Sequence, residues 1–127
     1  MHRIKYFDDF DGLLINIEGE PSLEELLQII EKITVFNPLR TNIDVIYDLS
    51  KLDASVVTSD FLKSFVYQIP SETVEKRAGA SVAYVAQDAL TFGMTMVHQA
   101  LITHLPINTS VFHAVDEAKD WIISNKN

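Results

Sequence analysis

The stretch at residues 43–49, IDVIYDL, has the composition of a strand at the centre of a sheet. Val, Ile and Tyr favour extended structure, and apolar residues at successive positions indicate a strand that is covered on both faces. A second stretch of this kind, ASVAYVA, lies at residues 80–86. Strands buried on both faces occur mainly in parallel sheets whose crossovers are helices. These two stretches therefore predict a protein of the α/β class.

Amphipathic segments lie before, between and after these two strands. Two short alternating runs, separated by the turn residues Asp9, Asp11 and Gly12, predict a β-hairpin. A capping box at Ser22 and Glu25 begins the first of about four helices. The predicted strands are residues 3–8, 13–18, 43–49, 80–86 and 110–113, and the predicted helices are residues 23–36, 61–69, 88–105 and 116–124.

The order of these elements is ββαβαβαβα. Repeated strand–helix units connect parallel neighbours through right-handed crossovers. The sequence thus predicts an α/β fold in which the N-terminal hairpin leads into a mostly parallel five-stranded sheet, and it predicts one domain over residues 1–127.

Composition excludes several classes of function. The chain has 18 acidic and 10 basic residues, a net charge of −8, and no cluster of Lys and Arg to contact nucleic-acid phosphates. It has no cysteine, which excludes thiolate metal sites and fits a reducing compartment. The N-terminal residues lack the apolar core of a signal peptide, and no purely apolar run is long enough to cross a membrane. We therefore expect a cytoplasmic protein without a nucleic-acid partner or a membrane span.

Three stretches, VIYDLSKLD at residues 45–53, ASVAYVA at 80–86 and VFHAVDEAKDWI at 111–122, combine with this order of elements. Together they resemble the STAS-like family, whose members include the anti-sigma-factor antagonists of sporulation. More closely, the chain looks like the small bacterial STAS-like proteins that are often grouped with the CRAL-TRIO lipid-transfer fold. The resemblance spans nearly the whole chain. It implies a non-enzymatic interaction or regulatory module with a protein partner or, from the CRAL-TRIO side, a binder of an apolar or lipid-like molecule.

In the anti-sigma antagonists, an Asp-Leu-Ser-like turn leads to an Asp-Ser-Ser-Gly-like box whose serine accepts phosphate. The turn is matched here at residues 48–50, but residues 56–59, VVTS, lack the aspartate and the glycine. The resemblance therefore makes Thr58 and Ser59 candidate phosphoacceptors. A hydroxyl at the start of a helix also caps its unpaired amides, and this structural role is the favoured interpretation.

The helix predicted at residues 88–105 is unusual in its charge, because Asp88 is the only formally charged side chain between Arg77 and Asp116. Helical spacing predicts that its core stripe consists of Leu90, Gly93, Met94, Val97, Leu101 and Leu105. Phe92 and Met96 then lie on roughly the opposite face, where a solvated helix carries Lys or Glu. We expect something other than water to cover them.

Three coverings fit this pattern. A second copy of the protein would give a homo-oligomer, with a dimer favoured, since aromatic residues and Met are enriched at interfaces. An apolar small molecule beside the helix would use the adaptable Met side chains, with Tyr84 or His98 as a polar contact. The third covering is the chain's own loops, and the sequence leaves all three open.

Signatures of catalysis and metal binding are weak. His98 and His104 are six residues apart, which places them about 120° apart on a helix, unlike the i, i+4 pair of a metal site. His113 could join one of them from the following strand, but no acidic ligand is evident alongside. For an enzyme, only His98, His104 and Asp48 are candidates, and no reaction follows from them. We therefore predict a non-enzymatic protein without cofactor or metal.

Overall fold

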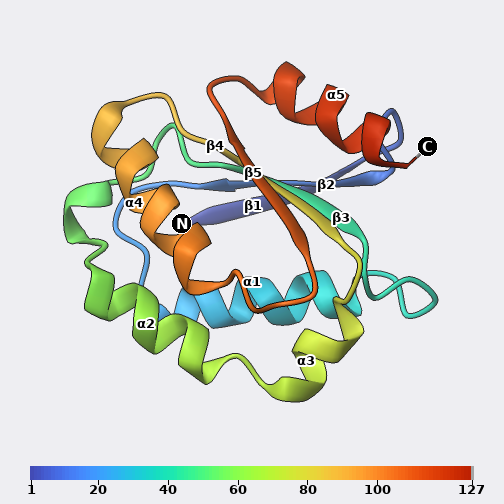
Figure 1. Ribbon diagram of the computed structural model, residues 1–127, viewed down its shortest axis with the longest axis horizontal. Helices are drawn as coiled ribbons and strands as arrows, with labels where there is room; N and C mark the ends of the chain where they lie inside the picture. The colour runs from blue at the N-terminus through green and yellow to red at the C-terminus, as the bar shows by residue number, and fades with distance from the viewer. Residues whose placement is uncertain (127) are drawn as a thin grey trace.

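The computed structural model describes residues 1–126 and places a five-stranded sheet at the centre of the protein (Figure 1). The strands lie across the sheet in chain order; β1 and β2 are antiparallel, and all other neighbours are parallel. The structure confirms the predicted hairpin that leads into a mostly parallel sheet. The strands are β1 (His2–Phe7), β2 (Gly12–Ile17), β3 (Asp44–Asp48), β4 (Ser81–Val85) and β5 (Asn108–Phe112).

Helices cover both faces of the sheet (Figure 1). On one face α5 (Val115–Asn125) packs by itself, and its Ala118 and Ile122 share a core with Ile46 and Ala83 of the sheet. On the other face α2 (Ser59–Gln68) lies between α1 (Leu23–Val35) and α4 (Ala89–Leu101).

Two short elements were not predicted from the sequence. They are the 3-10 turn at Ala54–Val56 and helix α3 (Ser71–Lys76), which brings the number of α-helices to five in the described part of the chain. Helix α3 buries none of its residues. A helix without a buried face has no periodic apolar pattern, so the sequence offers no signal for it.

The predicted core stripe of α4 was wrong at Leu90 and Val97, whereas Met94 does pack against the core. The structure buries Thr91, Thr95 and His98 instead, and it leaves Leu90 59% and Val97 43% exposed. The two threonines tolerate burial because their hydroxyls are bonded within the helix. Thr91 donates to the Asp88 carboxylate at 3.0 Å, and Thr95 donates to the Thr91 carbonyl at 2.8 Å. The helix therefore turns its small polar residues inward and exposes part of its apolar surface.

Helix α4 ends at Leu101, before the predicted end at Leu105. Residues 102–105 form turns, in which the Leu105 amide donates to the Ile102 carbonyl at 3.0 Å. Pro106 follows directly, and a proline has no N–H with which to extend a helix. The early end lets β5 begin at Asn108, ahead of the predicted start at residue 110.

Candidate ligand-binding site

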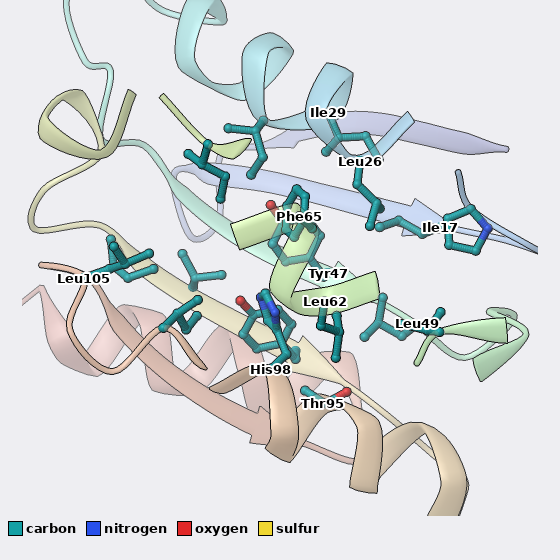
Figure 2. Close-up of a pocket in the computed structure, with 18 of the residues that line it drawn as sticks. Ile17, Leu26, Ile29, Tyr47, Leu49, Leu62, Phe65, Thr95, His98 and Leu105 are labelled. Atoms are coloured by element: carbon teal, nitrogen blue, oxygen red, sulfur yellow. The ribbon is translucent and has the colours of Figure 1, made fainter. Parts of the chain in front are cut away.

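A cavity of about 130 Å³ lies between the sheet and helices α1, α2 and α4 (Figure 2). Most of the side chains around it are apolar, and Figure 2 shows Phe65, Tyr47 and His98 converging near its centre. The walls include Ile17, Tyr47, Val82 and Tyr84 of the sheet, Leu26 and Ile29 of α1, Leu62 and Phe65 of α2, and Met94, Thr95 and His98 of α4.

Parallel strand pairing positions the aromatic side chains of this cavity. Tyr47 of β3 and Tyr84 of β4 are partners in the register, so both project from the same face of the sheet, and their rings stack with centroids 5.4 Å apart. His98 meets the Tyr84 ring edge-on at 5.6 Å, and Phe65 stacks on His98 at 6.0 Å. Four rings from four different elements thus come together.

His98 lines the cavity and carries a buried ring nitrogen without a partner in the described part of the chain. The side chain is 9% exposed, and its Nδ1 has no hydrogen-bond partner among residues 1–126. Burial lowers the pKa of His98 from 6.5 to about 4, so the imidazole is neutral at pH 7. A neutral imidazole has one donor and one acceptor nitrogen. A buried nitrogen without a partner is a candidate contact for a bound molecule.

The two tyrosines add hydroxyl groups to the same space. Burial raises the pKa of Tyr47 to about 12 and raises the pKa of Tyr84 further. Burial is the main cause of both shifts, and no hydrogen-bonded side chain contributes to either. Both phenols therefore stay protonated and can donate a hydrogen bond to a molecule in the cavity.

Arg77 also lines the cavity, from the turn that follows α3. Its side chain is 9% exposed, and Nη1 donates to the carbonyls of Thr41 at 3.0 Å and Ile43 at 2.5 Å. Desolvation lowers the pKa of the guanidinium, but an arginine remains charged at neutral pH. The cavity is thus apolar along its length and has a cation in its wall.

The residues predicted as interface or ligand contacts divide into two places. Tyr84 and His98 lie together in the cavity wall. Phe92 and Met96 are not among the residues that line it. Met96 is 48% exposed, whereas Phe92 stacks on the His113 ring with centroids 5.3 Å apart. The chain's own loop therefore covers part of Phe92, which is the third of the coverings that the sequence left open.

Thr58 and Ser59 lie at the start of α2, as predicted. The Thr58 hydroxyl accepts a hydrogen bond from the Phe61 amide at 3.1 Å, which confirms the capping role. Ser59 is the first residue of the helix and is exposed. Asp48 accepts hydrogen bonds from the Asn16 side-chain amide and the Ser50 backbone amide, both at 3.1 Å. Asp48 is thus an acceptor for amides at the end of β3.

The remaining histidines do not form a metal site with one another. His104 and His113 are exposed. Across residues 1–126, no group of three or more His, Asp or Glu side chains is placed to hold a metal ion.

Sequence reasoning missed two residues of the site, Tyr47 and Arg77. Tyr47 lies in the apolar stretch at residues 43–49, and a hydroxyl in a strand predicted to be buried could have marked it as a possible polar contact. Arg77 is the last basic residue before the long stretch with little charge, and this position is only weak evidence that its side chain belongs to a site. Neither signal says which cavity the side chain reaches, because that depends on strand register and helix packing.

Comparison with solved structures finds a similar fold. A crystal structure of an uncharacterized protein of the DUF3478 family, from Shewanella loihica PV-4 and with a SpoIIAA-like fold, matches with a TM-score of 0.63. The two sequences are 16% identical, and the match covers 96% of this chain and 92% of that chain. The protein has a SpoIIAA-like fold. This result confirms the STAS-like architecture predicted from the sequence.

Comparison with protein-family models gives no match, and neither does comparison with curated proteins. Within residues 1–126, no helix combines the length and the apolar character that crossing a membrane requires.

Proposed function

We propose that this protein is a non-enzymatic binding module that takes a small, mostly apolar molecule into the cavity beneath α1, α2 and α4. The observation that carries the proposal is the unpartnered Nδ1 of His98 in a wall of apolar and aromatic side chains. A buried polar atom without a partner costs free energy, and a ligand that satisfies it recovers that cost on binding.

The size of the cavity limits the ligand. Its volume of about 130 Å³ is similar to that of an engineered apolar cavity of about 150 Å³ that binds benzene in another protein. The fit is therefore to one aromatic ring or a short aliphatic chain. The hydroxyls of Tyr47 and Tyr84 and the imidazole of His98 provide the polar contacts that orient such a ligand.

Titration of the ¹⁵N-labelled protein with benzyl alcohol, followed by NMR, tests this proposal. We expect the amide signals of β3, β4 and α4 around Tyr47, Tyr84 and His98 to shift with saturation. Thr95→Leu extends a side chain into the cavity and is expected to weaken binding at least tenfold. Val97→Leu is the matched control, because Val97 is exposed on the same helix. Shifts confined to the protein surface, or equal affinity in both variants, would refute the proposal.

A second candidate function is a protein-interaction module that associates through the outer surface of α4, either with a second copy or with a regulatory partner. Its support is the apolar character of that surface, where Leu90, Met96 and Val97 are all more than 40% exposed. An exposed apolar patch without charge is typical of an interface. The SpoIIAA-like fold is compatible with such a role.

Analytical ultracentrifugation of the wild type and of Phe92→Glu with Met96→Lys tests this second candidate. We expect the wild type to be a dimer and the variant to be a folded monomer. An unchanged sedimentation coefficient would refute this candidate function. Phosphorylation of the exposed Ser59 hydroxyl would connect such a module to signalling. Ser59 lies in the first turn of α2, where a phosphate would meet free helix amides.

A further inference from the structure

The cavity wall contains a buried cation without a carboxylate partner. Arg77 is 9% exposed, and it forms no ion pair with any carboxylate in residues 1–126. Its bonds to the Thr41 and Ile43 carbonyls both come from Nη1. Buried charges in proteins are normally paired, and a guanidinium has five N–H donors in a planar fork. Nη2 and Nε therefore remain as donors for another group.

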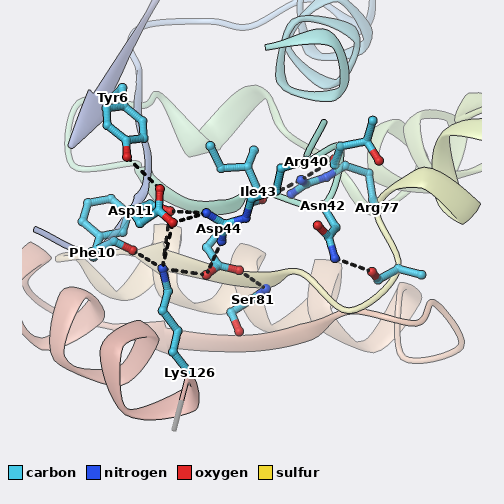
Figure 3. A network of polar contacts seen from close by, with 12 residues as sticks. Tyr6, Phe10, Asp11, Arg40, Asn42, Ile43, Asp44, Arg77, Ser81 and Lys126 are labelled. Carbon is cyan, nitrogen blue, oxygen red and sulfur yellow. Dashed lines mark hydrogen bonds and ion pairs between the residues drawn. The ribbon is translucent and has the colours of Figure 1, made fainter. Parts of the chain in front are cut away.

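Asp44 is the carboxylate that acts most strongly on Arg77, and other groups already bind it (Figure 3). Its Oδ1 accepts from the Ser81 amide at 2.8 Å. Its Oδ2 lies 3.5 Å from Arg40 and 3.5 Å from Lys126. Arg40 and Lys126 also share Asp11. The three cations of this region thus face two carboxylates, which leaves a local excess of positive charge in a protein whose net charge is −8.

Neutral hydrogen-bond donors accompany this cation in the cavity. Tyr47 and Tyr84, whose rings stack 5.4 Å apart, line the same cavity as Arg77. Apart from His98, Thr73 and Thr95, the rest of the wall is apolar, and the cavity has a volume of about 130 Å³. A cation, two hydroxyl donors and an apolar chamber are the complement of a molecule with one acidic end and a compact hydrocarbon body.

We propose that the ligand is a small monocarboxylic acid with an aromatic or short aliphatic body, bound through its carboxylate by Arg77 with help from Tyr47 and Tyr84. This inference rests on the proposed function of the cavity. A carboxylate matches the planar guanidinium fork through two parallel hydrogen bonds. One cation balances one negative charge, so a monocarboxylate fits this wall better than a phosphate dianion does.

The test compares two pairs of ligands by isothermal titration calorimetry at pH 7. Benzoate is paired with the uncharged benzyl alcohol, and hexanoate with 1-hexanol. We expect at least one acid to bind the wild type at least tenfold more tightly than its alcohol. Arg77→Met is expected to remove that preference while changing the affinity for the alcohol less than about threefold. Arg40→Met is the control, because Arg40 is a cation of the same region that does not line the cavity.

The outcomes separate this inference from the proposed function. Equal affinity for acid and alcohol in the wild type, or a preference that Arg77→Met leaves intact, would overturn the inference and leave the cavity as a site for neutral molecules. Failure of all four ligands to bind would overturn both. If Arg77→Met does not fold, Tyr47→Phe combined with Tyr84→Phe takes its place. That variant keeps both rings and is expected to weaken the acids by about fivefold or more and the alcohols by less, because a hydrogen bond to a charged acceptor is the stronger one; an equal loss for the alcohols would count against the inference.

Discussion

Acidification is expected to destabilise the protein through His98, and this effect isolates the consequence of burying the imidazole. The unfolded chain binds a proton at this side chain near pH 6.5, whereas the folded protein binds it only near pH 4. Between these values the unfolded state holds more protons, so the free energy of unfolding falls as the pH falls. The stability is fully present above pH 6.5 and is lost progressively down to pH 4.

The magnitude follows from the separation of the two pKa values. One pKa unit corresponds to about 1.4 kcal/mol, so the complete loss is about 3 kcal/mol. About 2 kcal/mol of it falls between pH 7.5 and pH 5.0. Tyr84 contacts the His98 ring, and Tyr47 and Arg77 line the same cavity; the phenols stay neutral and the guanidinium stays charged throughout this range. The carboxylates of Asp11, Glu25 and Asp88, whose pKa values are lowered in the folded protein, titrate at more acidic pH.

Urea unfolding at pH 7.5 and pH 5.0, followed by the fluorescence of Trp121, measures this loss. Trp121 is the only tryptophan and packs against Phe112 in the fold, so its signal reports unfolding. His98→Leu removes the titrating group, and its loss of stability is expected to be about 2 kcal/mol smaller than that of the wild type. His104→Leu is the control, since His104 is exposed and should leave the loss unchanged. Equal losses in the wild type and His98→Leu would refute the burial argument.

Three further predictions concern local structure. Thr58→Ala is expected to lower the free energy of unfolding by about 1 kcal/mol, because it removes the cap of α2. Ser59→Ala is the control and should change the free energy of unfolding by less than about 0.5 kcal/mol. Equal effects of the two variants in urea unfolding would contradict the assignment of the cap. Gly12→Ala should cost about 1–3 kcal/mol, since a Cβ at Gly12 would lie 2.7 Å from the Asp44 carbonyl oxygen. Gly93→Ala should instead raise the melting temperature, because its Cβ would meet nothing within 4 Å and alanine favours the helix; a lower melting temperature would contradict this reasoning.

The elements that the sequence predicted correctly carry local signals. The β1–β2 hairpin follows from alternation around a turn. The start of α1 follows from Ser22, whose hydroxyl accepts from the Glu25 amide at 3.0 Å. The start of α4 follows from Asp88, which caps the helix through the Thr91 amide at 2.8 Å. Such signals involve residues at most four apart, so the order of elements and the class of fold could be predicted from the sequence.

The buried face of α4 could not be predicted from the sequence, for a physical reason. Its apolar residues surround much of the helix, so the periodicity does not select one side. Packing against α2 and the sheet selected the side that carries His98, and internal hydrogen bonds made it possible to bury Thr91 and Thr95 there. Leu90 and Val97 are exposed because this side of α4 is buried instead of theirs.

The candidate site was predicted only in part. The sequence analysis predicted Tyr84 and His98 as polar contacts for an apolar ligand, and both residues line the cavity. Tyr47 joined them through the pairing of β3 with β4, and Arg77 joined through a long-range contact with the start of β3. The sequence by itself thus determined the strands, the caps and the α/β order, because those depend on neighbouring residues. The tertiary structure alone decided which rings meet and where a buried charge is left without a partner, because burial and pairing arise only when distant segments pack together.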